Sequence, residues 1–163
     1  MKRSICIILL FSLFLSGCSV LGERFKEPVT FYYVRENYQK DMEPVIASEI
    51  REASGHRQDL SYLLALYSMG PSKEGLLSPL PRNSKLTLTE YTQDKILINL
   101  SESIPSISDA DFTLASACIA LTCTELTGIR QITVACGEKT ITIQEDKLLQ
   151  DSNIASEPQE ETN

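Results

Sequence analysis

The sequence predicts a single domain of the α+β class, a two-layer sandwich in which two amphipathic helices pack on one face of a mixed β-sheet. Several short stretches alternate apolar and polar residues at the spacing of a strand, and two longer stretches repeat apolar residues at the spacing of one helical face. Since each helix has one apolar face, both bury it most readily against the same side of one twisted sheet.

The first part of the domain predicts two strands. Residues 29–34 follow a proline and are rich in β-branched and aromatic side chains, which favours a strand. Residues 44–51 alternate, with Ala47 and Glu49 on one face and Ile50 on the other. The alternation indicates a second strand.

A helix and a stiff loop follow these strands. Apolar residues in 60–67 recur at i, i+3, i+4 and i+7. The helix is expected to end at Gly70-Pro71, because glycine adopts the left-handed cap conformation and proline cannot continue a helix. The loop then runs from Gly75 to Pro81 with leucines at its centre. We expect Gly70, Pro71, Gly75 and Pro81 to be structurally important.

The second half predicts two hairpins separated by a helix. One hairpin joins 85–90 to 95–100, and the other joins 132–136 to 141–143 through a turn at Gly137. The helix begins at a cap on Ser108 or Asp109 and ends at Gly128.

Polar residues of these elements are expected at the surface. One face of the sheet is expected to meet water or another protein, and it carries Thr87, Thr89, Tyr91, Thr133, Thr140 and Thr142. Four acidic residues near element ends are expected on solvated faces or in caps, namely Glu49, Glu52, Asp109 and Asp111.

The first residues carry an export signal. Lys2 and Arg3 precede an apolar run over 5–15 that closes on Leu15-Ser16-Gly17-Cys18. The run is about half the roughly 20 apolar residues that a membrane-spanning helix needs. Leu-Ser-Gly-Cys resembles the lipobox of bacterial lipoproteins, which implies cleavage before Cys18 and a diacylglyceryl group on its thiol. The alternatives are a secretory signal with a chance cysteine and a short uncleaved anchor.

The chain therefore divides into a signal peptide (1–17), a lipidated tether (18–27), a domain (28–146) and a tail (147–163). The tail is expected to be disordered because it is acidic and lacks aromatic residues; a docking peptide is the alternative. Loss of Lys2 and Arg3 leaves 13 of the 15 basic residues against 22 acidic ones, a net charge of −9. This charge excludes nucleic acid as a partner, because it repels phosphate.

Five short motifs follow one another over 28–143, namely Gly70-Pro71, Gly75-Leu76, Ser78-Pro79-Leu80-Pro81, Ile98-Asn99-Leu100-Ser101 and Leu121-Thr122-Cys123-Thr124-Glu125-Leu126. This ordered series resembles the GerMN domain of sporulation and germination proteins. In that family a helix ends in Gly-Pro, a Gly-Leu loop with prolines follows, a hairpin ends in a Val-Asp-Leu-Ser-like segment, and a later helix ends in a Thr-Leu-Thr-Glu-like segment. Asn99 and Asn83-Ser84 depart from the aspartate and Gly-Thr that are common there.

The resemblance implies a binding or assembly module of the cell envelope without enzymatic activity, in some members linked to sporulation or germination. The expected partners are the lipid bilayer, through acylated Cys18, and an envelope protein or further copies of the chain. The expected location is the extracytoplasmic side of the cell membrane. No cofactor or metal is expected. The alternative is a lipoprotein that binds a small ligand or the cell wall in a pocket beside the proline-rich loop.

Residues that suggest catalysis are few. His56 is the only histidine, and it has Ser54 and Asp59 as sequence neighbours. No Gly-x-Ser-x-Gly elbow accompanies them, so a solvated loop histidine is expected and an envelope hydrolase is the alternative.

The cysteines leave two outcomes open. Cys118 and Cys123 are five residues apart on the expected helix, which puts their Cα atoms roughly 8.6 Å apart on different faces, too far for a disulfide or a two-ligand zinc clip. Either could pair with Cys136 across helix and strand. Buried free thiols are the other expectation.

Overall fold

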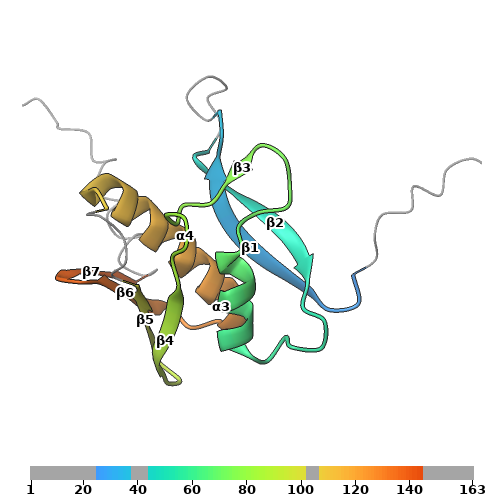
Figure 1. The fold of residues 1–163 in the computed structure, drawn as a ribbon. Coiled ribbons are helices and arrows are strands. Elements are labelled where there is room, and N and C mark those ends of the chain that lie inside the picture. The colour runs from blue at the N-terminus through green and yellow to red at the C-terminus, as the bar shows by residue number, and fades with distance from the viewer. Residues whose placement is uncertain (1–24, 38–43, 102–106, 145–163) are drawn as a thin grey trace, which may run out of the picture.

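The computed structural model describes residues 25–37, 44–101 and 107–144 of the chain. The predicted signal peptide (1–17), Cys18 and the predicted tail (147–163) lie outside these residues. The elements in chain order are β1 (Pro28–Arg35), β2 (Ile46–Glu52), α3 (Leu60–Ser68), β3 (Leu76–Leu77), β4 (Leu86–Tyr91), β5 (Lys95–Leu100), α4 (Asp109–Thr127), β6 (Gln131–Cys136) and β7 (Lys139–Gln144) (Figure 1).

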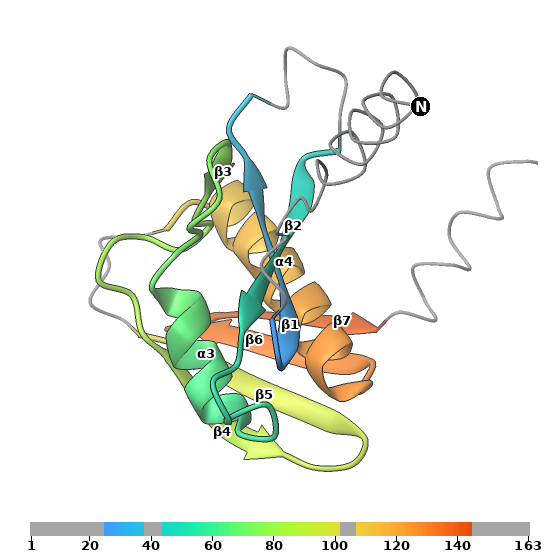
Figure 2. The same ribbon diagram turned by 90° about the vertical axis from the view of Figure 1, so that its right-hand side faces the viewer.

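The larger sheet is mixed and has the strand order β4-β5-β6-β7. Both predicted hairpins are present, and β5 runs parallel to β6, with α4 as the crossover between them. Ile96, Ile98, Ile132 and Val134 are fully buried on one face of this sheet. Both helices lie against that face (Figures 1 and 2).

The helix ends follow from local residues, and those at Ser108, Gly128 and Gly70 were predicted. The Ser108 hydroxyl accepts a hydrogen bond from the Asp111 backbone N–H at the start of α4, and Gly128 ends it with a φ of 76°. Asp59 caps α3 by accepting from the Tyr62 N–H. Gly70 has a φ of 85°, the left-handed conformation that an L side chain rarely adopts.

The remaining strands form a second sheet, with the order β2-β1-β3. Figures 1 and 2 show this smaller sheet on the opposite side of the helices from the four-stranded sheet. The α+β class and the packing of both helices on a mixed sheet are confirmed. The expectation of a two-layer sandwich with a single sheet was wrong, because the strands form two sheets and the helices lie between them.

Contacts at the edge of β1 explain why the sheets stay separate. The Tyr32 backbone N–H donates to the Thr122 hydroxyl of α4 at 3.0 Å, and its carbonyl accepts from the Tyr67 hydroxyl of α3 at 3.1 Å. These backbone groups would otherwise bond to another strand. β3, which lies in a stretch expected to be a loop, pairs with β1 only at Val34 and Arg35.

An aromatic cluster joins the smaller sheet to α3. The Tyr33 and Tyr67 rings stack with centroids 4.9 Å apart, and Phe31 meets Tyr67 edge-on at 5.8 Å. The Tyr33 hydroxyl donates to the Tyr67 carbonyl. All three side chains are fully buried. The hydroxyls of the stacked pair therefore cross-link strand and helix in both directions.

The threonine face of the larger sheet is largely as predicted. Thr87, Thr89, Thr140 and Thr142 are exposed, and the Thr133 and Thr142 hydroxyls are 3.0 Å apart. Tyr91 was wrongly expected on this face. A bulge between Leu88 and Glu90 places Tyr91 opposite the buried Ile96, and residues directly opposite in a sheet share a face.

We expect Tyr67→Phe to destabilise the domain by about 1–3 kcal/mol. The ring stack survives this change, whereas the partly buried Tyr32 carbonyl loses its partner, and an acceptor shielded from water without a partner costs about this much. Urea denaturation followed by circular dichroism measures the loss. The matched control is the half-buried Tyr62→Phe, which removes a hydroxyl outside the aromatic cluster. Equal stability of the Tyr67→Phe variant and the wild type would contradict the role given to this bond.

Candidate functional site

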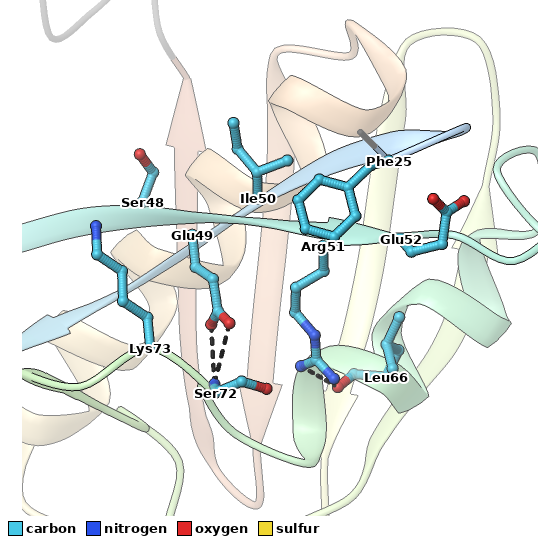
Figure 3. A pocket seen from close by; sticks show the side chains of 9 residues that line it. All are labelled: Phe25, Ser48, Glu49, Ile50, Arg51, Glu52, Leu66, Ser72 and Lys73. Atoms are coloured by element: carbon cyan, nitrogen blue, oxygen red, sulfur yellow. Dashed lines mark hydrogen bonds between the residues drawn. The ribbon is translucent and has the colours of Figure 1, made fainter. Parts of the chain in front are cut away.

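The candidate site is a pocket of about 760 Å³ between the outer edge of β2 and the loop that follows α3 (Figure 3). Strand β2 supplies consecutive residues to it, Ser48 and Ile50 pointing one way and Glu49 and Arg51 the other. The other lining residues are Phe25, Glu52, Leu66, Ser72 and Lys73.

Arg51 binds the end of α3. Its Nη1 donates to the carbonyls of Leu66 at 3.3 Å and Gly70 at 3.0 Å, and its guanidinium lies 5.8 Å from the Phe31 ring centroid. A cation is favourable here, because the helix dipole leaves partial negative charge at this end. Burial raises the pKa of the neighbouring Tyr33 to about 12, although the Arg51 charge partly opposes the shift.

Glu49 holds the next part of the same loop. Both carboxylate oxygens accept from the Ser72 backbone N–H at 3.1 Å. The side chain is only 7 % exposed, so the expectation of a solvated or capping position for Glu49 was wrong. The alternation in 44–51 indicated two faces without showing which one is buried, and the buried face carries the charges.

Of the four predicted loop residues, Gly70 and Pro71 adjoin this site, Gly75 lies at the end of β1, and Pro81 bonds within its own loop. Gly70 accepts from Arg51, while the Gly75 carbonyl accepts from the Glu36 N–H at 3.0 Å. Pro71 is half-buried between Gly70 and Ser72, and the Pro81 carbonyl accepts both from the Ser84 N–H and from its hydroxyl. Their structural importance stays a prediction, with these contacts as its physical basis.

Two carboxylates fix the point where the chain enters the domain. Glu52 accepts from the backbone N–H groups of Lys26, Glu27 and Ser54, and Glu27 accepts from that of Gly55. Burial would raise the pKa of Glu52, but the backbone donors and the Lys26 charge outweigh it and hold that pKa below its ordinary value. The last residues of the predicted tether are thus bound to the end of β2.

The structure does not place His56 in a catalytic arrangement with its sequence neighbours. Its ring stacks on Tyr62 with centroids 4.1 Å apart, and the Asp59 carboxylate accepts from the Tyr62 backbone instead. His56, Ser54 and Asp59 are all exposed. The absence of enzymatic activity stays a prediction.

Cys118, Cys123 and Cys136 are free thiols, so neither cross-element disulfide is present. Cys118 and Cys123 are fully buried on α4, and burial raises the pKa of each thiol to about 12. They pack as small apolar residues. Within 25–37, 44–101 and 107–144, no group of three or more His, Cys, Asp or Glu side chains is arranged to hold a metal. In the same part of the chain, neither helix has the length and apolarity to cross a bilayer.

These features define a small α+β domain in which two sheets enclose two helices. It is similar to the first GerMN domain of the sporulation protein GerM from Bacillus subtilis, with a TM-score of 0.48 and 13% identity over 70% of this chain and 85% of that one. It is also similar to the tandem GerMN domains of that protein, with a TM-score of 0.47 and 26% identity over 69% of this chain and 39% of the tandem chain.

A third similar structure is a proposed lipoprotein from Clostridium perfringens, with a TM-score of 0.44 and 19% identity over 74% of this chain and 90% of that one. No protein-family model matches the sequence, and no curated protein matches it. Both GerM structures are structures of GerMN domains, the family that the ordered series of motifs in this sequence resembles.

We expect Arg51→Met to destabilise the domain by about 2–3 kcal/mol. Methionine keeps an apolar stem of similar length, but it loses the two charge-assisted hydrogen bonds to the end of α3. Arg51→Lys is the matched control, because it keeps the charge beside the helix end and loses only part of the bonding. Urea unfolding checks the order of stability, wild type above Lys above Met. A Met variant as stable as the wild type would contradict the proposal that the Arg51 hydrogen bonds to the end of α3 stabilise the domain.

We expect stability to fall as pH rises above about 9. The folded state keeps the Cys118 and Cys123 thiols protonated up to about pH 12, whereas an unfolded chain ionises them near 9. The unfolded state then binds fewer protons, and each thiol lowers the free energy of unfolding by up to about 1.4 kcal/mol per pH unit. Urea titrations from pH 8 to 10 measure the slope. Cys123→Ala should show a shallower slope than the wild type, and identical slopes would contradict the assignment.

Proposed function

We propose that this chain is a membrane-tethered lipoprotein of the bacterial cell envelope, whose GerMN-like domain acts as a protein-interaction or assembly module in a process such as sporulation or germination. The module acts by binding and not by catalysis. Cys18 carries the lipid and becomes the first residue of the mature protein.

The observation that carries the proposal is the motif Leu15-Ser16-Gly17-Cys18 at the end of a basic and apolar leader. An ordinary secretory signal does not require cysteine at this point, whereas lipid attachment does. Each buried methylene of an acyl chain contributes about 0.8 kcal/mol, so two chains hold a protein of this size at a bilayer where one binds only marginally.

The surface of the domain supports an interaction role. Large apolar side chains are exposed around the loop after α3 and on β2, with Met69 at 78 %, Ile50 at 54 % and Leu77 at 48 % exposure. Each of these side chains would leave water if a partner covered it, and burial of apolar surface favours association. The threonine face of the larger sheet offers a second, polar surface.

A second candidate function is the binding of a small ligand or of cell-wall material. The pocket of about 760 Å³ beside the loop after α3 is the observation that favours it. Glu49 and Arg51, which lie at this pocket, are already bonded to backbone groups of the loop. A small ligand held by these two side chains would have to displace those bonds, whereas association through the exposed apolar side chains would leave them in place.

The test is the intact mass and membrane partitioning of the full chain expressed in a bacterial host, beside Cys18→Ala. We expect the wild type to start at Cys18, to carry the added mass of acyl chains and to stay with the membrane fraction. The variant should lack the lipid and lose its membrane association. Ser19→Ala is the matched control and should behave as the wild type does. Lipid-free behaviour of both wild type and Cys18→Ala would overturn the tethering proposal.

A further inference from the structure

Strand β2 has an outer edge that no described strand covers. The order β2-β1-β3 places it at the border of its sheet. The backbone N–H and carbonyl of Tyr32 bond to the helices and so face away from β2. Its neighbours Phe31 and Tyr33 therefore face β2, where their backbone groups bond to those of Glu49 and Ala47. The backbone groups of the alternate residues, Ser48 and Ile50 among them, therefore point outward. Such an edge is a template for one more strand.

Two charges restrict which strand can be added there. Glu49 and Arg51 point from this edge strand toward the domain interior (Figure 3), and their bonded partners are the neutral backbone groups of Ser72, Leu66 and Gly70. Inward-pointing charges on an edge strand prevent indiscriminate pairing, because most added strands would leave them opposite apolar or like-charged residues. A compatible strand offers a cation opposite Glu49 and an anion opposite Arg51, two residues apart.

A second copy of this chain meets that requirement in one register. We propose that two copies pair antiparallel through their β2 edges, with Ile50 opposite Ile50 at the two-fold axis, Glu49 opposite the partner's Arg51, and Arg51 opposite the partner's Glu49. This inference deepens the proposed assembly function, on which it rests, by naming the partner and its surface. The exposed Ile50 side chains then meet each other at the centre of the interface.

The neighbouring registers place like charges opposite each other. Outward backbone groups must face each other, so the registers differ by steps of two residues in the opposing strand. A step one way sets Glu49 against Glu49, and a step the other way sets Arg51 against Arg51. Like charges directly opposite each other are destabilising. Only the register centred on Ile50 pairs both charges with their opposites.

Phe25 lies beside the same edge, with Ile50, Arg51 and Glu52 among the neighbouring pocket residues (Figure 3). Its side chain lines the same pocket as these β2 residues and is 36 % exposed, so a second strand added at this edge would meet it. Replacing it with a smaller side chain should therefore favour pairing rather than weaken it.

The test is disulfide cross-linking of the full chain in host membranes, with Ile50→Cys and its matched control Ser48→Cys. In the proposed register the two Ile50 Cα atoms are about 5.5 Å apart, within the disulfide range of roughly 4.4–6.8 Å. The two Ser48 positions are offset by about 13 Å along the strand, which is too far. We expect a disulfide-linked dimer for Ile50→Cys, a higher yield when Phe25→Ala is added, and only monomer for Ser48→Cys and for the wild type with its own cysteines.

A dimer from Ser48→Cys, or only monomer from Ile50→Cys, would overturn the inference. Both positions are exposed, and an unchanged melting temperature shows that each variant is folded. The membrane fraction of the same samples keeps this test apart from that of the tether. A lipidated chain that gives only monomer supports the proposed lipoprotein and contradicts the dimer. A dimer found in the soluble fraction supports the dimer and contradicts the membrane tether.

Discussion

The fold depends on the reciprocal contact between Tyr67 of α3 and the strand β1. Tyr67 stacks on Tyr33, accepts a hydrogen bond from it and donates one to the Tyr32 carbonyl. The smaller sheet contains one long hairpin and the two-residue β3, and an isolated hairpin is marginally stable in water. Its stability therefore comes from docking on the helices. The same contact occupies the edge of β1, so one residue both attaches the second sheet and keeps it separate from the first.

The elements that could be predicted from the sequence are those fixed by neighbouring residues. The periodicity of 60–67, the cap at Ser108 and the turn at Gly137 act over a few residues, and each gave the observed helix or hairpin. The division into two sheets could not be predicted in this way, because Tyr32 and Thr122 are 90 residues apart. The position of Tyr91 depended on a bulge, which shifts a side chain to the other face without a clear change in the alternation.

The sequence predicted the loop of the candidate site, but it did not predict that two charged side chains of β2 bond to that loop. Gly70-Pro71 indicates a helix end from residue type alone, and Gly70 has the expected conformation. Glu49 and Arg51 look like a solvated strand face, since charged residues are rarely buried. They are tolerated here because the loop supplies backbone groups of the right kind, N–H for the carboxylate and carbonyls for the guanidinium. Burial of these charges follows from the loop that packs on them.

The position of the tether is consistent with pairing of two membrane-anchored copies. Lys26 and Glu27 are bound by Glu52 at the end of β2, so each chain leaves its domain beside the docking edge. In the register centred on Ile50, Glu52 lies opposite the partner's Ser48, and the two Glu52 positions are about 13 Å apart along the strands. Two chains anchored in one bilayer through Cys18 would then enter the pair at neighbouring points. A shared membrane would raise the effective concentration of each copy for the other and so favour association through an edge of only a few residues.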